Sequence, residues 1–187
     1  MSPSTLHGFS YPSPFDVPDV PADMQRLAEQ LDPFIPLYVK PTTTDTNNTA
    51  VAKGDAQLLV NMPATGVYLV EAFTAYSCPN VAVDVQQSWS AATGISLLSR
   101  FVTGPEVAMT STASSLMVNR PLSQFLTAQG FGIASSGNNF IRDEMLVNVT
   151  IANAVLRLLF NQNVSTAGVD VTRQPGSYMV LTRQTAV

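Results

Sequence analysis

The chain of 187 residues has little of the side chains that most often carry chemistry: one cysteine, Cys78, and one histidine, His7. A single cysteine cannot form an internal disulfide, and one cysteine with one histidine cannot fill a structural zinc site. The chain also has only two lysines, Lys40 and Lys53, and a net charge of -4. These shortages argue against zinc-dependent chemistry and against a nucleic-acid partner, because nucleic-acid binding needs a basic face.

Charge is scarce throughout. Charged residues make up 12% of the chain, about half the share of an ordinary soluble domain. The surface must therefore consist largely of uncharged polar residues, or part of it must be covered by protein. No stretch approaches the roughly 18 consecutive apolar residues of a membrane span, and residues 1–15 lack the basic and apolar regions of a signal peptide. We therefore expect assembly in a cytosol, without a membrane partner.

Proline is concentrated at the start of the chain, with five prolines within residues 2–21. Proline removes backbone donors and favours extended conformations, so this segment is predicted to be an extended arm. Flexible tails are usually poor in aromatic residues, whereas this arm carries Phe9, Tyr11 and Phe15. We expect these three side chains to lie in a groove on another protein.

One short helix is predicted over residues 21–32. Met24, Leu27 and Leu31 follow a helical spacing and form one apolar stripe. A helix of about three turns is not stable alone in water, so the stripe must pack against its own domain, a copy of itself or another protein. Residues 1–33 are therefore predicted to be an anchor made of the arm and this helix.

Residues 34–187 are predicted to be a mainly β domain. Short runs rich in β-branched and aromatic residues are separated by turn signals about every 10 residues, and no second amphipathic helix is evident. Roughly eight such strands predict a single β-sandwich of the jelly-roll type, preceded by the extended arm and one short α-helix. The predicted strands are residues 34–40, 57–62, 66–76, 81–89, parts of 117–131, 140–151, 154–160 and 177–183. Residues 91–112 are predicted to be mostly loop.

The longest of these runs, residues 66–76, is apolar on both faces and is interrupted only by Glu71. This pattern predicts a central strand that is covered on two sides. Because few charges lie nearby, we expect a neighbouring copy of the chain to cover one sheet face.

The carboxylates do not form a recognisable catalytic site. Asp143 and Glu144 are adjacent, and neighbours on a strand point to opposite faces, so they cannot share a site. Glu71 and Asp84 each interrupt an apolar strand, and we expect each to be half-buried beside an arginine. The candidate partners are Arg100, Arg157 and Arg183. A hydrolase that uses Asp84 or Glu71 is a minor alternative. We expect no catalytic residue, no cofactor and no metal.

A further alternative is a carbohydrate-binding module of similar sandwich form. In that case Trp89 and Tyr76 would stack on the faces of sugar rings. Lone aromatic residues at strand ends are more often part of a core or an interface.

Five segments resemble parts of virion proteins from tailed phages of actinobacteria. Residues 15–32 resemble their N-terminal anchor segments. Residues 67–76 and 83–90 are similar to a pair of strands in which a Glu-Ala-Phe run precedes an Asp-centred strand that ends in Trp-Ser. Residues 156–165 and 175–183 are similar to their last two strands.

This resemblance implies a jelly roll of the tumour-necrosis-factor or C1q type, generally trimeric, exposed on a virion and without catalytic residues. We therefore expect a homotrimeric capsid decoration (cement) protein that attaches to the major capsid protein through its N-terminal arm. The alternative is a minor tail or receptor-binding protein, attached to a tail structural protein and able to bind a host-surface glycan. The head is favoured because the chain has no collagen repeat, heptads or β-helix repeat that could form a shaft.

Overall fold

The computed structural model describes residues 5–6, 9–10, 37–39, 41–107, 117–122, 124–133 and 139–184. The chain divides into two compact units, Met1–Pro36 and Leu37–Val187. The helix expected over residues 21–32 lies outside the described residues and stays a prediction. The same holds for the side chains expected to make anchor contacts: Phe9, Tyr11, Phe15, Met24, Leu27 and Leu31.

The described part of the first unit is a short antiparallel pair of strands. Strand β1 (Thr5–Leu6) pairs with β2 (Phe9–Ser10), so that the backbone of Leu6 lies opposite that of Phe9. This part of the predicted extended arm therefore turns back on itself.

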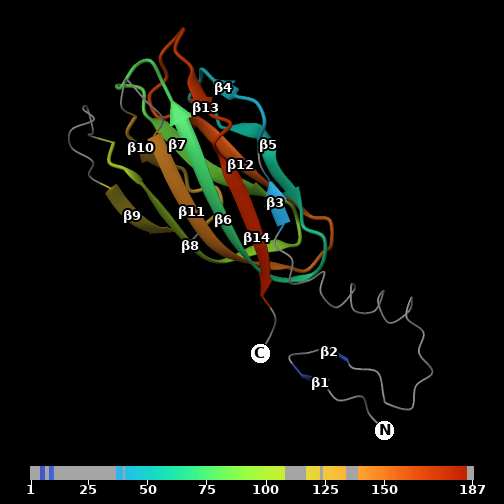
Figure 1. Cartoon of the computed structure of the whole chain (residues 1–187). Coiled ribbons are helices and arrows are strands. Elements are labelled where there is room, and N and C mark those ends of the chain that lie inside the picture. Colours follow the sequence, from blue (N-terminus) through green and yellow to red (C-terminus); the bar gives the residue numbers. More distant parts are fainter. Residues whose placement is uncertain are drawn as a thin grey trace. The chain divides into compact units, whose positions relative to one another are not determined.

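The second unit contains two antiparallel sheets, which Figure 1 shows as two layers. The large sheet has the strand order β3-β14-β6-β11-β8-β9, with β13 paired to β4 and β6, and the small sheet has the order β10-β7-β12-β5. The prediction of a mainly β fold is confirmed, and the two sheets are consistent with a β-sandwich. The strand bounds are β3 (Leu37–Val39), β4 (Asp45–Asn47), β5 (Lys53–Asn61), β6 (Gly66–Ser77), β7 (Val85–Ala91), β8 (Ile95–Pro105), β9 (Met117–Leu122), β10 (Gln129–Phe131), β11 (Asn139–Val149), β12 (Val155–Gln162), β13 (Val171–Arg173) and β14 (Tyr178–Gln184).

The core forms where alternate residues of the two sheets face each other. On β6, Tyr68, Val70 and Ala72 point inward and are buried. Trp89 and Leu158 meet them from the small sheet. Each fully buried large apolar side chain contributes about 1.5–3 kcal/mol, so this alternation holds the sheets together.

The long strand β6 lies in the middle of the large sheet, between β11 and β14, as its apolar sequence predicted. The length of strand β8 was not predicted, because residues 91–112 look like a loop with room for one short strand. Its pairing with β11 explains the difference: Leu97 lies opposite Val147 and Ser99 lies opposite Leu146. Leu98 is thus the extra residue of a β-bulge, which breaks the period of two that sequence patterns depend on.

A buried ion pair ties the two sheets together. Asp143 on β11 accepts hydrogen bonds from Arg100 on β8, with Nη2 2.7 Å from Oδ2 and Nε 3.0 Å from Oδ1. From the small sheet, Trp89 Nε1 and Gln87 Nε2 donate to the same Oδ2 at 2.7 and 3.1 Å. Asp143 is fully buried and Glu144 faces outward, so the prediction that they point to opposite faces is confirmed.

A second buried pair joins the sheets nearer one end. Arg173 on β13 donates to Asp55 on β5, with Nε 2.5 Å from Oδ2. The other carboxylate oxygen of Asp55 accepts the backbone N–H groups of Gln57 and Leu58, each at 2.8 Å. Both residues of the pair are fully buried. Two of the ion pairs among the described residues therefore lie in the interior.

Replacing Asp143 with Asn is expected to lower the free energy of unfolding by about 3–5 kcal/mol, because Arg100 would then be a buried charge without a counter-charge. The matched control is Glu144→Gln, one residue along the same strand but on the surface, which should change stability by less than about 1 kcal/mol. Urea unfolding of both variants measures the difference. Equal effects of the two substitutions would contradict the assignment.

Candidate functional site

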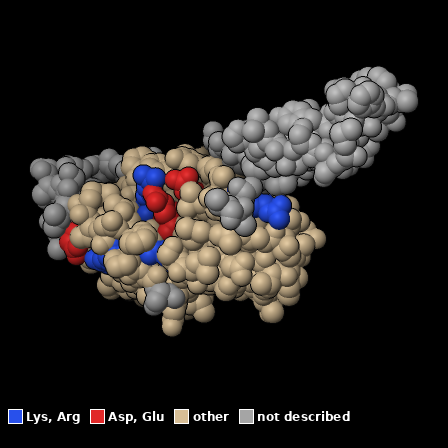
Figure 2. All heavy atoms as spheres, turned by 90° about the horizontal axis from the view of Figure 1, so that it is seen from below, with Lys and Arg blue, Asp and Glu red and all other residues tan. Residues whose placement is uncertain are grey.

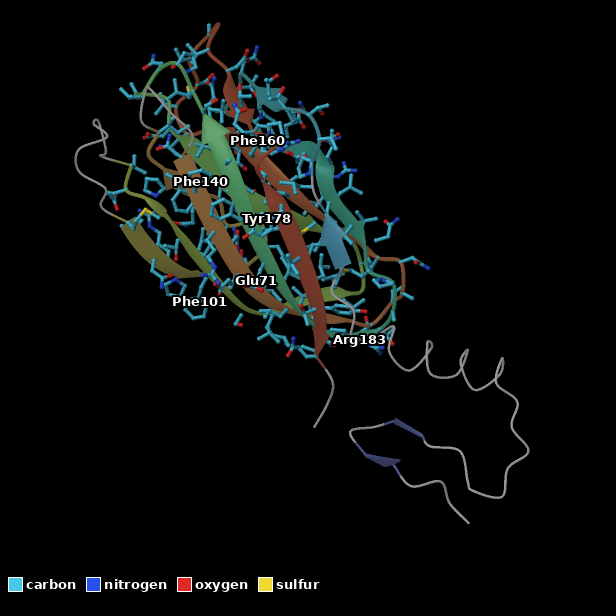
Figure 3. The ribbon with its side chains drawn as sticks, viewed as in Figure 1. Glu71, Phe101, Phe140, Phe160, Tyr178 and Arg183 are labelled. Atoms are coloured by element: carbon cyan, nitrogen blue, oxygen red, sulfur yellow. The ribbon has the colours of Figure 1, made fainter. Side chains whose placement is uncertain are left out.

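The side of the large sheet that points away from the small sheet is the candidate functional site, and we call it the outer face. Because strands alternate, the residues between the inward ones on β6, β11, β14 and β8 form this face. In Figure 3, Tyr178, Glu71, Phe140 and Phe101 are labelled across these four strands. Antiparallel sheets usually present polar side chains to water, and this face instead exposes several large apolar ones.

Three rings form an aromatic row on the outer face. Strand pairing places Tyr178 opposite Phe73, and their ring centroids are 5.4 Å apart at an interplanar angle of 21°. On the other side, Phe140 stacks on Phe73 with centroids 4.9 Å apart at 22°. The outer rings are well exposed, Phe140 at 44% and Tyr178 at 42%. Farther across the sheet, Phe101 on β8 is 49% exposed.

A charged cluster lies beside the aromatic row. Glu71 on β6 is directly opposite Glu144 on β11, a pairing that is unfavourable for two like charges. Arg142 Nη2 bridges them, at 3.1 Å from Glu71 Oε1 and 2.5 Å from Glu144 Oε1. All three side chains are partly exposed. The cluster offers charges of both signs to a partner.

The aromatic row and the charged cluster enclose a hollow of about 830 Å³, whose lining includes Glu71, Phe73, Arg142, Tyr178 and Val180. The two carboxylates of the charged cluster are partly exposed and share one guanidinium. Catalytic groups are usually desolvated and individually positioned, so this arrangement suits recognition better than proton transfer. On the side that Figure 2 shows, most of the described surface is uncharged, and the charged residues gather in a few places.

The two residues predicted to stack on sugars, Trp89 and Tyr76, are fully buried. Trp89 donates to Asp143 as described above, and the hydroxyl of Tyr76 donates to Gln87 Oε1 at 3.2 Å. Burial raises the pKa of Tyr76. Neither ring can reach a surface ligand, which corrects the sugar-stacking prediction. Alternation in the sequence shows that residues share a side but does not show which side faces the core.

The predicted arginine partners also need correction. Glu71 is partly exposed, as expected, but its partner is Arg142 and not Arg100, Arg157 or Arg183. Arg100 is committed to Asp143. Asp84 takes part in no ion pair among the described residues and is buried rather than half-buried. The residues of the aromatic row were not singled out from the sequence, and the only signal for them was the apolar character of both faces of residues 66–76.

The described residues contain no group of three or more His, Cys, Asp or Glu side chains that could hold a metal ion. Within the same part of the chain, no helix has the length and apolar character needed to cross a membrane. Cys78 is 4% exposed, and burial is the main cause that raises the pKa of its thiol. A thiol of this kind is a poor nucleophile, because the thiolate is the reactive form.

No protein-family model matches the chain, and a comparison with curated proteins finds no match. The outer face and the fold are therefore the features that bear on its function.

Replacing Arg142 with Ala leaves Glu71 and Glu144 directly opposite each other without a bridging cation. The expected cost is about 0.5–1 kcal/mol of unfolding free energy at low salt, and less at 1 M salt, where the repulsion is screened. Adding Glu144→Gln to this variant should recover most of the loss. Denaturant unfolding at two salt concentrations measures both effects, and a cost that is independent of salt would contradict the electrostatic explanation.

Proposed function

We propose that this protein is a non-enzymatic virion structural protein, a homotrimer that decorates the capsid surface and attaches to the major capsid protein through residues 1–33. The observation that carries the proposal is the outer face, with its aromatic row beside a charged cluster. Contiguous exposed apolar surface of this kind marks protein–protein contact. Tyr, Phe and Arg are also the residue types that interfaces favour.

The dimensions of the outer face support a protein partner. The sheet order continues from β8 to β9, where Met117 is also exposed. Because neighbouring strands lie about 4.8 Å apart, the exposed apolar side chains from Tyr178 on β14 to Met117 on β9 extend over roughly 20 Å. A standard interface buries about 800 Å² per partner, an area roughly 28 Å on a side, so this row of side chains spans much of the width of one interface. A surface of this width, with exposed rings beside the hollow, can be covered by another folded surface.

A second copy of the same chain is the partner that the chemistry favours. The charged cluster has both signs, so the Arg142 of one copy can approach a glutamate of the next. Closed rings of identical chains satisfy every such contact. Covering this face also accounts for the low share of charged residues, because a surface covered by protein needs few of them. The three-fold symmetry comes from the resemblance to trimeric virion proteins.

We also propose that the sandwich is a jelly roll. In that fold a long antiparallel hairpin is rolled up, so strand pairs nest within one another and successive pairs alternate between two sheets. The pairs β3–β14, β5–β12, β6–β11 and β7–β10 nest in this order. They also alternate between the large and the small sheet. The β8–β9 hairpin would then be an addition beside β11.

The use of charged residues supports a structural role. Two arginines and two aspartates are consumed in buried pairs that join the sheets, and Arg142 is shared by two glutamates. A decoration protein gains its binding from many copies and several arms, each weak alone. Such a role needs no reactive group.

The oligomer is tested with the double variant Phe140→Ser/Tyr178→Ser. At micromolar concentration the wild type is expected to sediment as a trimer and the variant as a monomer with a similar Tm, because both rings are about half exposed. Leu126→Ser is the matched control, since Leu126 is 69% exposed but does not belong to the outer face. It should remain trimeric. A monomeric wild type, or a double variant that stays trimeric, would contradict the proposal.

Attachment is tested by deleting residues 1–36, the first compact unit. Both apolar clusters of the sandwich lie in the second unit, so the truncated chain is expected to fold and to form trimers. It should no longer sediment with particles that bind the full chain. Retained binding would refute the anchor, and labelling of the full chain on intact particles distinguishes head from tail.

A further inference from the structure

Asp84 is a buried carboxylic acid in an unusual backbone conformation. It is 5% exposed and has a positive φ of 50°, a left-handed conformation that Asp and Asn tolerate better than most residues. One carboxyl oxygen, Oδ1, is buried without a hydrogen-bond partner. A buried polar atom without a partner is costly, and the cost is largest when the group is charged.

Three segments meet at Asp84. Asp84 is the last residue of the turn between β6 and β7. Its backbone carbonyl accepts a hydrogen bond, 3.2 Å long, from the backbone N–H of Asn163 in the loop after β12. The adjacent Val83 carbonyl accepts the N–H of Val164 at 3.1 Å. The backbone of Ile133, after β10, and the side chain of Asn163 are hydrogen-bonded to the carboxyl group. Figure 1 shows the turn after β6 and the loop after β12 at the same end of the sandwich.

No positive charge offsets this carboxylate among the described residues. Asp84 and Asp170, the latter on the loop after β12, both raise the pKa of the Cys78 thiol, which is on the same turn as Asp84. On β9, Arg120 lies over the ring of Phe131 and is paired with Glu106. Residues 131–133 have no ionisable side chain. Burial raises the pKa of Asp84 above its ordinary value of 3.8, and the two hydrogen bonds only partly oppose this shift.

We infer that the carboxyl group of Asp84 is a proton-operated latch for this end of the sandwich. When the group is neutral, the three segments pack around it without burying a charge. When it ionises, a charge without a counter-ion lies at their junction and weakens the packing. Asp84 lies at the end of the sandwich and not on the outer face, so this role does not depend on the proposed function.

The direction of the pH effect follows from linkage. The folded state holds the proton of Asp84 more tightly than the unfolded state, whose carboxyl has a pKa near 3.8. The stabilisation from this group is therefore complete below that value. It is lost as the pH rises through the raised pKa of the folded protein.

The test compares the full-length wild type with Asp84→Asn, which keeps the shape and the backbone tolerance but cannot ionise. At pH 7.5 the variant is expected to have a Tm about 2–4 °C above that of the wild type, and at pH 4 the gain should shrink. At pH 7.5 the backbone amides of Asn163 and Val164 should also exchange hydrogen more slowly in the variant.

Asp45→Asn is the matched control of opposite sign. Burial alone would raise the pKa of Asp45, but its hydrogen bond and charge interaction with Lys53 and the Ala56 N–H lower it overall. This variant should therefore have a lower Tm than the wild type at pH 7.5.

An Asp84→Asn variant whose Tm is unchanged, or is lowered equally at both pH values, would contradict the proposed role of Asp84. Carbon NMR titration of Asp84 in the wild type tests it without substitution, and a pKa at or below 3.8 would also overturn it.

Discussion

The carboxylate of Asp143 is the interaction on which the rest of the sandwich depends. It sits in the core and accepts hydrogen bonds from Arg100 in its own sheet and from Trp89 and Gln87 in the facing sheet. Uncompensated, a buried charge would cost several kcal/mol, so the strands must adopt the register that supplies these donors. A shift of β11 by one residue would move Asp143 to the surface and turn Arg142 and Glu144 inward. The interior thus determines which residues form the outer face.

The two sides of the large sheet use charge in different ways. Inside, the charged groups of both buried pairs are hydrogen-bonded to each other and to neighbouring groups. Outside, Arg142 forms ion pairs with two glutamates and remains largely exposed. The exposed pairs contribute little to folding, and their value is in matching a partner. The buried charges help to fix the strand register, and the exposed charges on the outer face are available to a partner. A chain with few charges can therefore define both its core and its contact surface.

The sequence predicted the mainly β class and the central strand, because residues 66–76 are rich in β-branched and aromatic residues and are apolar on both faces. It could not predict the full length of β8, where the bulge at Leu98 breaks the period of two. Nor could it place Trp89 inside and Phe140 outside, since both are aromatic residues on strands and only the packing of the second sheet decides between them. The pairing of Arg100 with Asp143 joins residues 43 positions apart, a distance at which local pattern carries no information. The candidate site was consequently visible only as a strand apolar on both faces.

Asp143 and Asp84 show how position decides what a buried carboxylate does. Asp143 lies between two long sheets, where three side chains donate hydrogen bonds to it, so its carboxyl group is paired within the native packing. Asp84 lies where turns meet, has an oxygen without a donor, and is best accommodated when a proton neutralises it. Local opening is easiest where loops rather than sheets make the contacts. A change in the charge of Asp84 therefore acts on the end of the sandwich first, while the sheet pairing that builds the outer face stays closed. The contact surface depends on the packing around Asp143, whereas the pH-sensitive end depends on Asp84. A change at one of these carboxyl groups can therefore leave the other region unchanged.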